Sequence, residues 1–287
     1  MTLQVSLTDH TRSVSADFSV RPGEILALVG SNGAGKSTIL NTVIGAHRPD
    51  SSKVTLSGRV LQDSSQKTWI PTHSRNVTLL RQDSALFPHL SVLENVCFPL
   101  RAQGVSRGQA RQAGNEVLAK LGLSELADRK PATLSGGQSQ RVALARALAS
   151  KAEVLLLDEP FSALDAGVAW QMRTLLREHV EHQRVIIVTH EFSDLVALAD
   201  RVVSLQYGQV ADSGEMLPVL QRVKTAHLRD VANGRHVDGV AVSGGIRLFV
   251  GRELTTQPHD LEIGTPCFAR FTTAGFQVFP LTVEAKC

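Results

Sequence analysis

Cysteine is scarce in this chain, and long uninterrupted apolar runs are missing. Its three cysteines, Cys97, Cys267 and Cys287, show no metal-ligand spacing and no evident pairing, so we expect reduced thiols in a reducing compartment. Charged residues interrupt every apolar stretch well short of the ~20 residues that a membrane-spanning helix needs. The first thirty residues also lack the basic segment and apolar core of an export signal. We therefore expect a cytoplasmic chain that neither is exported nor inserts itself into a membrane.

An excess of charge of one sign is missing as well. The 30 Lys and Arg residues are interspersed with 27 Asp and Glu residues, which leaves a net charge of only +3. A nucleic-acid-binding face needs a denser basic patch, so we expect no nucleic-acid partner. What the chain does have is 43% hydrophobic and 20% charged residues over 287 positions. This composition is typical of a folded globular protein, and the length allows one large domain with a small appendage.

The apolar residues that are present predict an α/β core. Between Leu3 and Val20 they alternate with polar residues, which is typical of two half-buried antiparallel strands in a hairpin. Continuous apolar runs, typical of strands buried on both faces, follow at 25–29, 77–80, 154–157 and 185–188, with helical segments between them. This order predicts a mainly parallel sheet that is covered by helices on both faces.

Two regions depart from this alternation. Between Ser84 and Ser150 the apolar spacing favours an inserted helical subdomain, with one helix around residues 110–121 and another from Gln138 to Ala149. Beyond a main domain at 1–224, short strands separated by Gly and Pro predict a small β module at 225–287. Its strands are expected at 239–242, 246–250, 266–271 and 276–280. Because about sixty residues are marginal for independent stability, we expect this module to lean on the main domain or on a partner chain.

A glycine-rich loop between the strand at 25–29 and a helix that starts near Lys36 has the full spacing of a phosphate-binding loop. Its residues are Gly30, Ser31, Asn32, Gly33, Ala34, Gly35, Lys36, Ser37 and Thr38. Glycines let successive backbone N–H groups point at the phosphates, Lys36 reaches the β and γ oxygens, and the Ser37 hydroxyl ligates Mg²⁺. The strand before it and the helix after it are the context that this motif requires, which argues against a glycine-rich turn without function.

A second phosphate-binding surface is predicted within the stretch from Leu134 to Gln138. Here Ser135, Gly136 and Gly137 open a helix, whose N-terminal N–H groups and dipole attract anions. Because the first loop is already complete, the simplest arrangement is a two-fold dimer in which this Ser-Gly-Gly turn faces the partner's nucleotide. Two ATP molecules would then join the two copies.

Polar residues that follow buried strands complete the candidate site. Asp158 ends one strand, where its carboxylate can hold the Mg²⁺ shell, and Glu159 beside it could orient and deprotonate an attacking water. His190 follows another strand and suits a γ-phosphate contact, while Gln82 follows a third and could ligate the metal or its water. Each residue type alone is more often structural or solvent-facing. Their joint occurrence favours catalysis. Asp165, a little further on, is predicted as the N-cap of a helix whose apolar face comprises Val168, Met172, Leu175, Leu176 and Val180.

Together these motifs closely resemble those of the ATP-binding subunit of ATP-binding-cassette (ABC) transporters, which have a P-loop NTPase core. The similar segments, in the family's order, are Walker A at 30–38, the Q-loop at Gln82, the signature sequence at 134–138, Walker B at 154–159, the D-loop at 162–165 and the switch histidine at His190. The resemblance covers residues 1 to about 220. It implies an ABC ATPase domain at 1–224 with its helical insertion at 84–150.

The resemblance also implies the cofactors and partners. ATP and Mg²⁺ would bind at the interface of a homodimer, with Ser37, Gln82 and Asp158 at the metal. The catalytic groups would be Glu159, His190 and Gln82, and the nucleotide site would also include Ser135, Gly136, Gly137, Gln138 and Asp165. Hydrolysis would be coupled to two integral-membrane permease subunits that dock beside Gln82 and the helical insertion, and indirectly to an extracytoplasmic substrate-binding protein. The protein would then lie at the cytoplasmic face of the cell membrane.

The cargo is suggested by one segment and one module. Residues 82–92 are similar to importers of oxyanions, polyamines and ferric iron, and Gln-Asp followed by Leu-Phe-Pro-His most resembles the molybdate importers. The module at 225–287 resembles a truncated OB-like (TOBE) domain of that group. Two roles are open for this module, oxyanion sensing and packing alone. The chain departs from the family where an aromatic residue usually stacks on adenine, because this stretch offers only His10, Thr11 and Arg12. A weaker stacking or cation–π contact by His10 or Arg12 is the remaining option there.

The leading function is therefore the ATPase of a molybdate or related oxyanion importer, with sulfate, ferric iron and polyamine as alternative cargoes. A soluble ABC ATPase of translation or DNA repair is an alternative from another class. Such proteins generally carry tandem cassettes or a long coiled coil, and this chain has one cassette and no heptads. An exporter of lipid or drug is disfavoured by the importer-like segment at 86–89 and by the β module.

Overall fold

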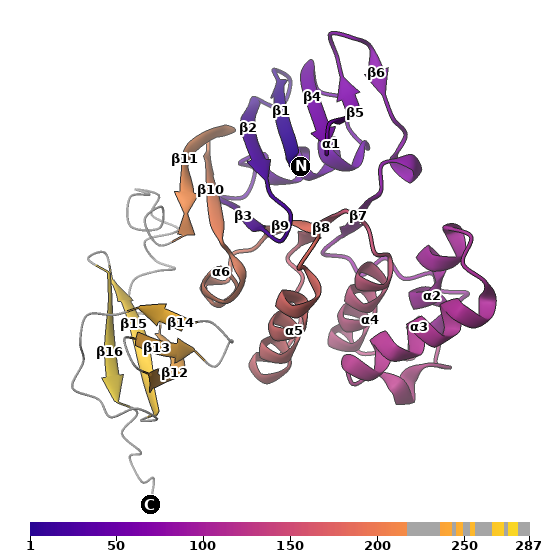
Figure 1. Cartoon of the computed structure of the whole chain (residues 1–287), viewed down its shortest axis with the longest axis vertical. Coiled ribbons are helices and arrows are strands. Elements are labelled where there is room, and N and C mark those ends of the chain that lie inside the picture. Colours follow the sequence, from indigo (N-terminus) through magenta and orange to yellow (C-terminus); the bar gives the residue numbers. More distant parts are fainter. Residues whose placement is uncertain (217–235, 243–244, 249–252, 256–265, 273–274, 281–287) are drawn as a thin grey trace, which may run out of the picture.

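The computed structural model describes residues 1–216, 236–242, 245–248, 253–255, 266–272 and 275–280, and these form two sheets (Figure 1). The first sheet has eleven strands in the order β6-β5-β4-β1-β2-β11-β10-β3-β9-β8-β7. They are β1 (Leu3–Asp9), β2 (Val14–Val20), β3 (Ile25–Gly30), β4 (Ser51–Leu56), β5 (Arg59–Asp63), β6 (Thr68–Trp69), β7 (Val77–Leu80), β8 (Val154–Asp158), β9 (Arg184–Val188), β10 (Arg201–Gln206) and β11 (Gln209–Glu215). The helices are α1 (Lys36–Ile44), α2 (Val92–Ala102), α3 (Arg107–Lys120), α4 (Gly136–Ala149), α5 (Ala166–His179) and α6 (Phe192–Leu198). Over the part of the chain described, no helix has the length and apolar content that a membrane span requires.

Parallel pairing dominates the half of this sheet that carries the phosphate-binding loop. The strands β10, β3, β9, β8 and β7 pair in parallel, and the last four of these are the strands that the buried apolar runs predicted. In the other half, β1 pairs antiparallel with both β2 and β4, which confirms the predicted hairpin. β11, which was not predicted, lies between β2 and β10 and joins the two halves. The α/β core with antiparallel N-terminal strands is thereby confirmed.

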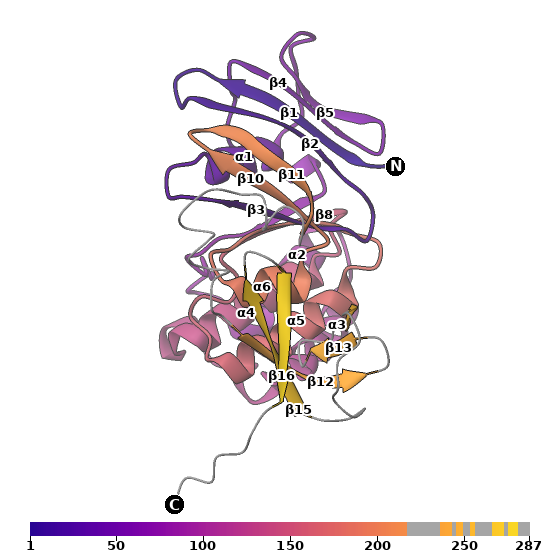
Figure 2. The same ribbon diagram turned by 90° about the vertical axis from the view of Figure 1, so that its left-hand side faces the viewer.

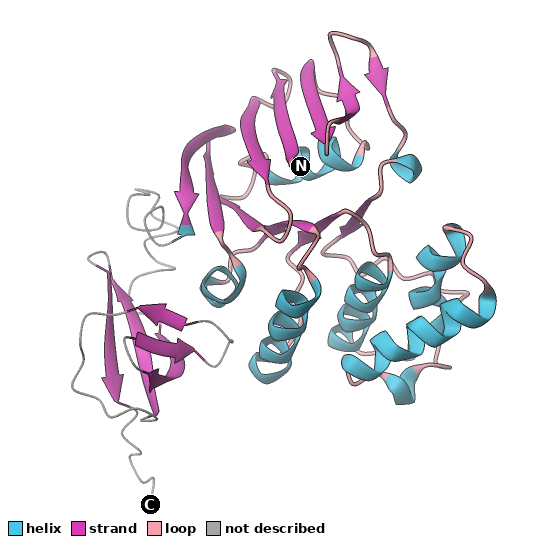
Figure 3. Ribbon diagram, in the orientation of Figure 1, coloured by secondary structure: helices cyan, strands magenta, loops and turns pink. Residues whose placement is uncertain are grey.

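The two faces of the parallel half are covered differently. Ile25, Ala27 and Val29 of β3 belong to an apolar cluster with α2 to α6, whereas Leu26 and Leu28 belong to a second cluster with α1, β1 and β2. α1 therefore lies between the parallel strands and the antiparallel strands (Figures 2 and 3). The prediction of helices on both faces holds, with the difference that α1 shares its face with the antiparallel strands.

The inserted helical region contains α2, α3 and α4, of which α3 and α4 were predicted. α3 confirms the helix expected around residues 110–121, and α4 begins two residues before the predicted Gln138 because Ser135 caps it. α2 was not predicted. Pro99 lies inside it, yet Ser91 and Glu94 form a complete capping box at its start, and this pattern could have located it.

The second sheet has five strands in the order β14-β13-β12-β15-β16. They are β12 (His236–Val242), β13 (Gly245–Leu248), β14 (Glu253–Thr255), β15 (Pro266–Thr272) and β16 (Gly275–Pro280). Four of them match the predicted strands, although the predicted end at Val250 lies outside the described residues. The proposed domain boundary at 224/225 and Cys287 also lie outside them.

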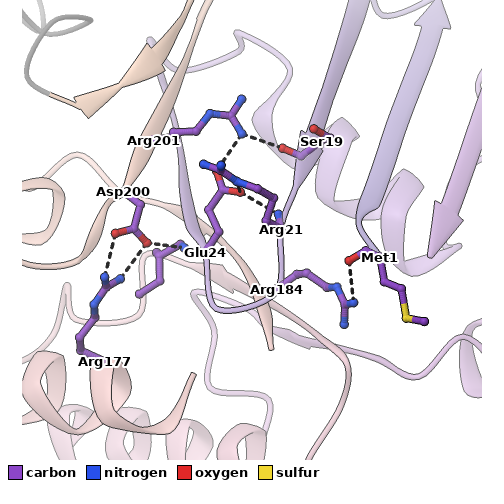
Figure 4. A network of polar contacts seen from close by, with 9 residues as sticks. Met1, Ser19, Arg21, Glu24, Arg177, Arg184, Asp200 and Arg201 are labelled. Carbon is purple, nitrogen blue, oxygen red and sulfur yellow. Dashed lines mark hydrogen bonds and ion pairs between the residues drawn. The ribbon is translucent and has the colours of Figure 1, made fainter. Parts of the chain in front are cut away.

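Ion pairs fix the edge of the first sheet where β3 and β10 begin, opposite to the phosphate-binding loop (Figure 4). Asp200, just before β10, accepts a hydrogen bond from the backbone N–H of Ile25 at 2.9 Å. Its two carboxylate oxygens also accept from Arg177 of α5, each at 2.8 Å. Glu24, just before β3, binds Arg201 of β10 at 2.7 Å. These contacts hold β3 and β10 in register with each other. The candidate site lies toward the opposite ends of these strands.

A buried arginine holds the C-terminal end of α1, the helix that begins at the phosphate-binding loop. Arg75 is fully buried, and its guanidinium donates to the carbonyl oxygens of Thr42 and Val43 at 3.0 and 3.1 Å. The guanidinium also lies 4.7 Å from the ring centroid of Trp69. Burial lowers the pKa of Arg75 to about 10, so the group is still charged at neutral pH. A positive charge at the C-terminal end of a helix is stabilising.

We expect Gly45→Ala to lower the free energy of unfolding by about 3 kcal/mol, through backbone strain and displacement of Arg75. Gly45 has a φ of 87°, and a Cβ atom there would lie 2.4 Å from the Nε of Arg75. Gly58→Ala is the matched control, because Gly58 has a φ of 85° but no heavy atom within 4 Å of the added Cβ. The control should lose only about 1 kcal/mol in urea unfolding. Equal losses in the two variants would show that Arg75 is not held against Gly45.

Candidate active site

A pocket of about 460 Å³ opens at the carboxyl edge of the parallel strands, where open α/β sheets bind their ligands. Its walls come from the β1–β2 turn, from the loop between β3 and α1, and from the residues that end or follow β7, β8 and β9. The lining residues are Arg12, Val14, Asn32, Gly33, Gly35, Lys36, Ser37, Thr38, Gln82, Asp158, Glu159, Val188 and His190. Sequence motifs that are up to 158 residues apart in the chain, from Asn32 to His190, thus meet in one cavity.

The phosphate-binding loop has the conformation that its glycines allow. Gly33 and Gly35 have φ values of 81° and 97°, and α1 begins directly after Gly35. At Gly30 a side chain is excluded, because a Cβ atom would lie 2.5 Å from the carbonyl oxygen of Leu205 on the neighbouring β10. Gly30 and two other predicted loop residues, Ser31 and Ala34, shape the loop without lining the pocket.

Lys36 is buried at the floor of the pocket. Its Nζ atom donates to the carbonyl oxygens of Gly30 and Ser31 at 2.7 and 2.9 Å. Burial lowers the pKa of Lys36, and the negative charges of Glu159 and Asp158 oppose that shift. A desolvated ammonium group at the N-terminal end of a helix, here α1, is suited to a polyanion such as a triphosphate.

The predicted catalytic groups converge on Glu159. One of its carboxylate oxygens accepts a hydrogen bond from the amide of Gln82 at 2.9 Å, and the other lies 3.2 Å from Nε2 of His190. The backbone of Glu159 has a φ of 48°, a left-handed conformation that is uncommon for a residue with a side chain. Its N–H is held by the carbonyl oxygen of Val188 at 2.9 Å. Glu159 is therefore held from β7 and β9, the two strands that flank its own, in the pocket that the phosphate-binding loop also lines.

The residues predicted at the metal suit Mg²⁺. Within the described ranges no group of three or more His, Cys, Asp and Glu residues could hold a metal by itself. Mg²⁺, however, is usually held by one or two carboxylates together with substrate phosphates and water. Ser37, Gln82 and Asp158 all line the pocket and offer oxygen ligands. Burial and the neighbouring Glu159 raise the pKa of Asp158, a shift that a bound cation would reverse.

The predicted second phosphate-binding surface lies outside this pocket. Ser135 caps α4, where its Oγ accepts from the N–H of Gln138 at 3.2 Å and its own N–H donates to the Gln138 side chain at 3.0 Å. None of the residues from 134 to 138 lines the pocket of the same chain. Asp165 is also outside the lining and caps α5 as predicted, accepting from the N–H of Val168 at 3.0 Å. The structure therefore does not bring these predicted nucleotide contacts to the chain's own site.

Gln140 is a positioning residue that the sequence reasoning missed. It is 4% exposed, and its amide donates to the carbonyl oxygen of Glu159 at 2.9 Å while accepting from the N–H of Ala163 at 2.8 Å. The helix that begins at Ser135 is thus tied to the strand end that carries Glu159. A polar residue on the buried side of a predicted helix was the signal that could have identified it.

The structure also separates the two residues considered for the nucleobase. Arg12 lines the pocket, and its backbone N–H is held by the carboxylate of Asp9 at 2.9 Å. Asp9 is in turn paired with His47 at 2.5 Å, beyond the end of α1. His10 is absent from the lining, and its N–H donates to Asp50.

Known proteins are similar to this chain in sequence and in fold. Residues 14–162 match the ABC transporter family. The molybdenum import ATP-binding protein ModC of Mycobacterium tuberculosis (strain H37Rv) is 40% identical over 97% of this chain and 78% of its own. The iron(III) import ATP-binding protein FbpC of Agrobacterium fabrum is also 40% identical, over 69% of this chain and 55% of its own. In structure, a dimeric post-hydrolysis state of the ATP-binding cassette MJ0796 bound to ADP and Pi is similar with a TM-score of 0.64 and 28% identity, covering 75% of this chain and 99% of that one. The chain belongs to the ABC transporter family, of which it is an ATP-binding subunit.

Proposed function

We propose that two copies of this chain hydrolyse ATP at two shared sites and so drive import through two permease subunits at the cytoplasmic face of a membrane. The observation that carries the proposal is the separation of two phosphate-binding surfaces. One, at Lys36, lies beside Glu159, Gln82 and His190, and the other, at Ser135, does not reach that pocket. A two-fold pair supplies each pocket with the missing surface. The dimeric state of the related MJ0796 cassette supports this arrangement.

In the proposed reaction each chain contributes defined groups. Lys36 and the loop N–H groups bind the β and γ phosphate oxygens, and Glu159 accepts a proton from the attacking water. Gln82 and His190 hold the two oxygens of the Glu159 carboxylate, which orients that base. Mg²⁺ bound by Ser37, Asp158 and Gln82 would neutralise charge on the phosphates. The partner's signature turn at 135–138 and the partner's D-loop, which includes Asp165, would close the site over the nucleotide.

For the cargo we propose molybdate or a related oxyanion. The similarity to a molybdenum import protein extends over 97% of the chain, including the module proposed at 225–287, whereas the similarity to an iron(III) import protein covers 69%. The permease would dock beside Gln82 and the helical insertion, and an extracytoplasmic binding protein would deliver the cargo. Ferric iron, sulfate and polyamine are the alternative cargoes.

The cargo can be tested by reconstituting the chain in proteoliposomes with a permease and a binding protein from the same genome that form a complex with it. We expect molybdate to stimulate ATP hydrolysis several-fold and to accumulate inside, with sulfate, ferric iron and spermidine giving smaller effects. A Lys36→Ala chain is the control for uptake that does not depend on ATP. Stimulation by ferric iron or spermidine alone would reject the oxyanion assignment. A fully active ATPase that never associates with a permease would favour the soluble ABC ATPases instead.

A further inference from the structure

The two-residue turn between β10 and β11 carries the chain's single tyrosine in an unfavourable setting. Tyr207 and Gly208 have φ values of 51° and 80°, the type I′ geometry that favours Asn-Gly or Asp-Gly. Tyrosine has no local side-chain hydrogen bond to offset a left-handed backbone. Tyr207 is also 88% exposed, so its ring is not buried in the fold. Neither turn formation nor core packing explains a tyrosine at this position.

This turn lies directly beside the candidate nucleotide pocket. Two residues before Tyr207, Leu205 pairs with Gly30, the first residue of the phosphate-binding loop. The carbonyl oxygen of Gly208 accepts from the N–H of Ser15 at 2.7 Å, and a Cβ on Gly208 would lie 3.3 Å from Cα of Val14. Val14 itself lines the pocket. The turn is therefore separated from the pocket by one layer of residues.

The side of the pocket next to this turn is the side left for the nucleobase. Phosphates are directed to Lys36 and Ser37, so the rest of the nucleotide extends toward the β1–β2 turn, where Arg12 lies. The pocket lining contains no Phe, Trp or Tyr side chain, and its one imidazole, that of His190, is paired with Glu159 at 3.2 Å. Among the described residues, the other large exposed aromatics are Phe98 in α2 and Trp170 in α5, and neither helix contributes to the lining.

We propose that the ring of Tyr207 stacks on the nucleobase of the bound ATP, with the Arg12 guanidinium as a second flat contact. The exposed ring of Tyr207, directly after β10, is then the surface on which the base stacks. Stacking of a base on an aromatic side chain is worth ~1–3 kcal/mol, so loss of the ring should weaken binding about 5- to 150-fold. The inference rests on the proposed ATP site.

The test compares two ligands that share phosphates and differ in the base. We expect Tyr207→Ala to weaken binding of AMP-PNP, measured by calorimetry with Mg²⁺, about 5- to 150-fold and to leave binding of inorganic tripolyphosphate unchanged. Tyr207→Phe should bind AMP-PNP like the wild type, because it keeps the ring. In Tyr207→Trp, the fluorescence of the new indole should change with AMP-PNP and not with tripolyphosphate. Trp170→Ala is the matched control, since it removes an exposed aromatic from an element outside the pocket.

The outcomes separate this inference from the function on which it rests. If the wild type binds AMP-PNP and Tyr207→Ala binds it equally well, the stacking contact is wrong and the ATP site stands. A parallel loss of AMP-PNP and tripolyphosphate binding would also overturn it, because the tyrosine would then act on the phosphate loop. If the wild type binds neither ligand and Lys36→Ala changes nothing, the ATP site itself fails.

Discussion

Glu159→Gln is expected to reduce the kcat of ATP hydrolysis by roughly 10²- to 10⁴-fold, the usual contribution of a positioned general base. ATP binding should persist, because the proposed site holds the phosphates through Lys36 and the loop. The amide keeps the size of the carboxylate and can still contact Gln82 and His190. In the wild type these two residues lie 2.9 and 3.2 Å from the carboxylate oxygens of Glu159. It cannot accept the proton of the attacking water. Bound ATP would therefore accumulate between two copies and hold them together.

Gel filtration with ATP and Mg²⁺ measures this second consequence. The variant should elute as a dimer with ATP and as a monomer without nucleotide. Glu125→Gln is the control, because it makes the same change at an exposed position outside the pocket. A Glu159→Gln protein that is monomeric with ATP and fully active would defeat both the role of the base and the shared site.

The strands that build the site could be predicted because their signal is local. A strand buried on both faces is a continuous apolar run, and the runs at β3, β7, β8 and β9 are found within a residue or two of their predicted ends. Parallel strands place their carboxyl ends at one edge. Gln82, Asp158 and His190 each end or follow such a run, so their convergence could be anticipated from sequence position alone.

Features that depend on tertiary neighbours could not be predicted in this way. Gln140 looks like any polar residue of a helix until α4 is placed against the carbonyl oxygen of Glu159. Arg75 can hold the C-terminal end of α1 only because β6 and the end of α1 surround its guanidinium. Tyr207 lies near the pocket through the pairing of β10 with β3, a contact between residues 175 positions apart, Leu205 and Gly30. These positions follow from the order of strands in the sheet, which local periodicity does not encode.

Ser135→Arg is expected to abolish ATP turnover while the chain still binds ATP as a monomer. Arginine removes the oxygen that caps α4 and places a long cationic side chain where the partner's γ-phosphate would lie. Loss of the cap alone costs about 1 kcal/mol of stability. Ser106→Arg is the matched control, since Ser106 caps α3 in the same way, accepting from the N–H of Gln109 at 3.4 Å. The control should keep its activity. Loss of monomer ATP binding in Ser135→Arg would place Ser135 in the chain's own pocket.

Mixing two inactive variants tests the shared site most directly. A Lys36→Ala chain has a damaged phosphate loop and an intact signature turn, and a Ser135→Arg chain has the reverse. In a mixed dimer, the intact loop of the second chain faces the intact turn of the first, so one complete site forms and the other is doubly damaged. ATPase activity should therefore reappear on mixing and peak near equal amounts of the two proteins. If all catalytic groups acted within one chain, every mixture would stay as inactive as its components, since neither chain alone carries a complete set.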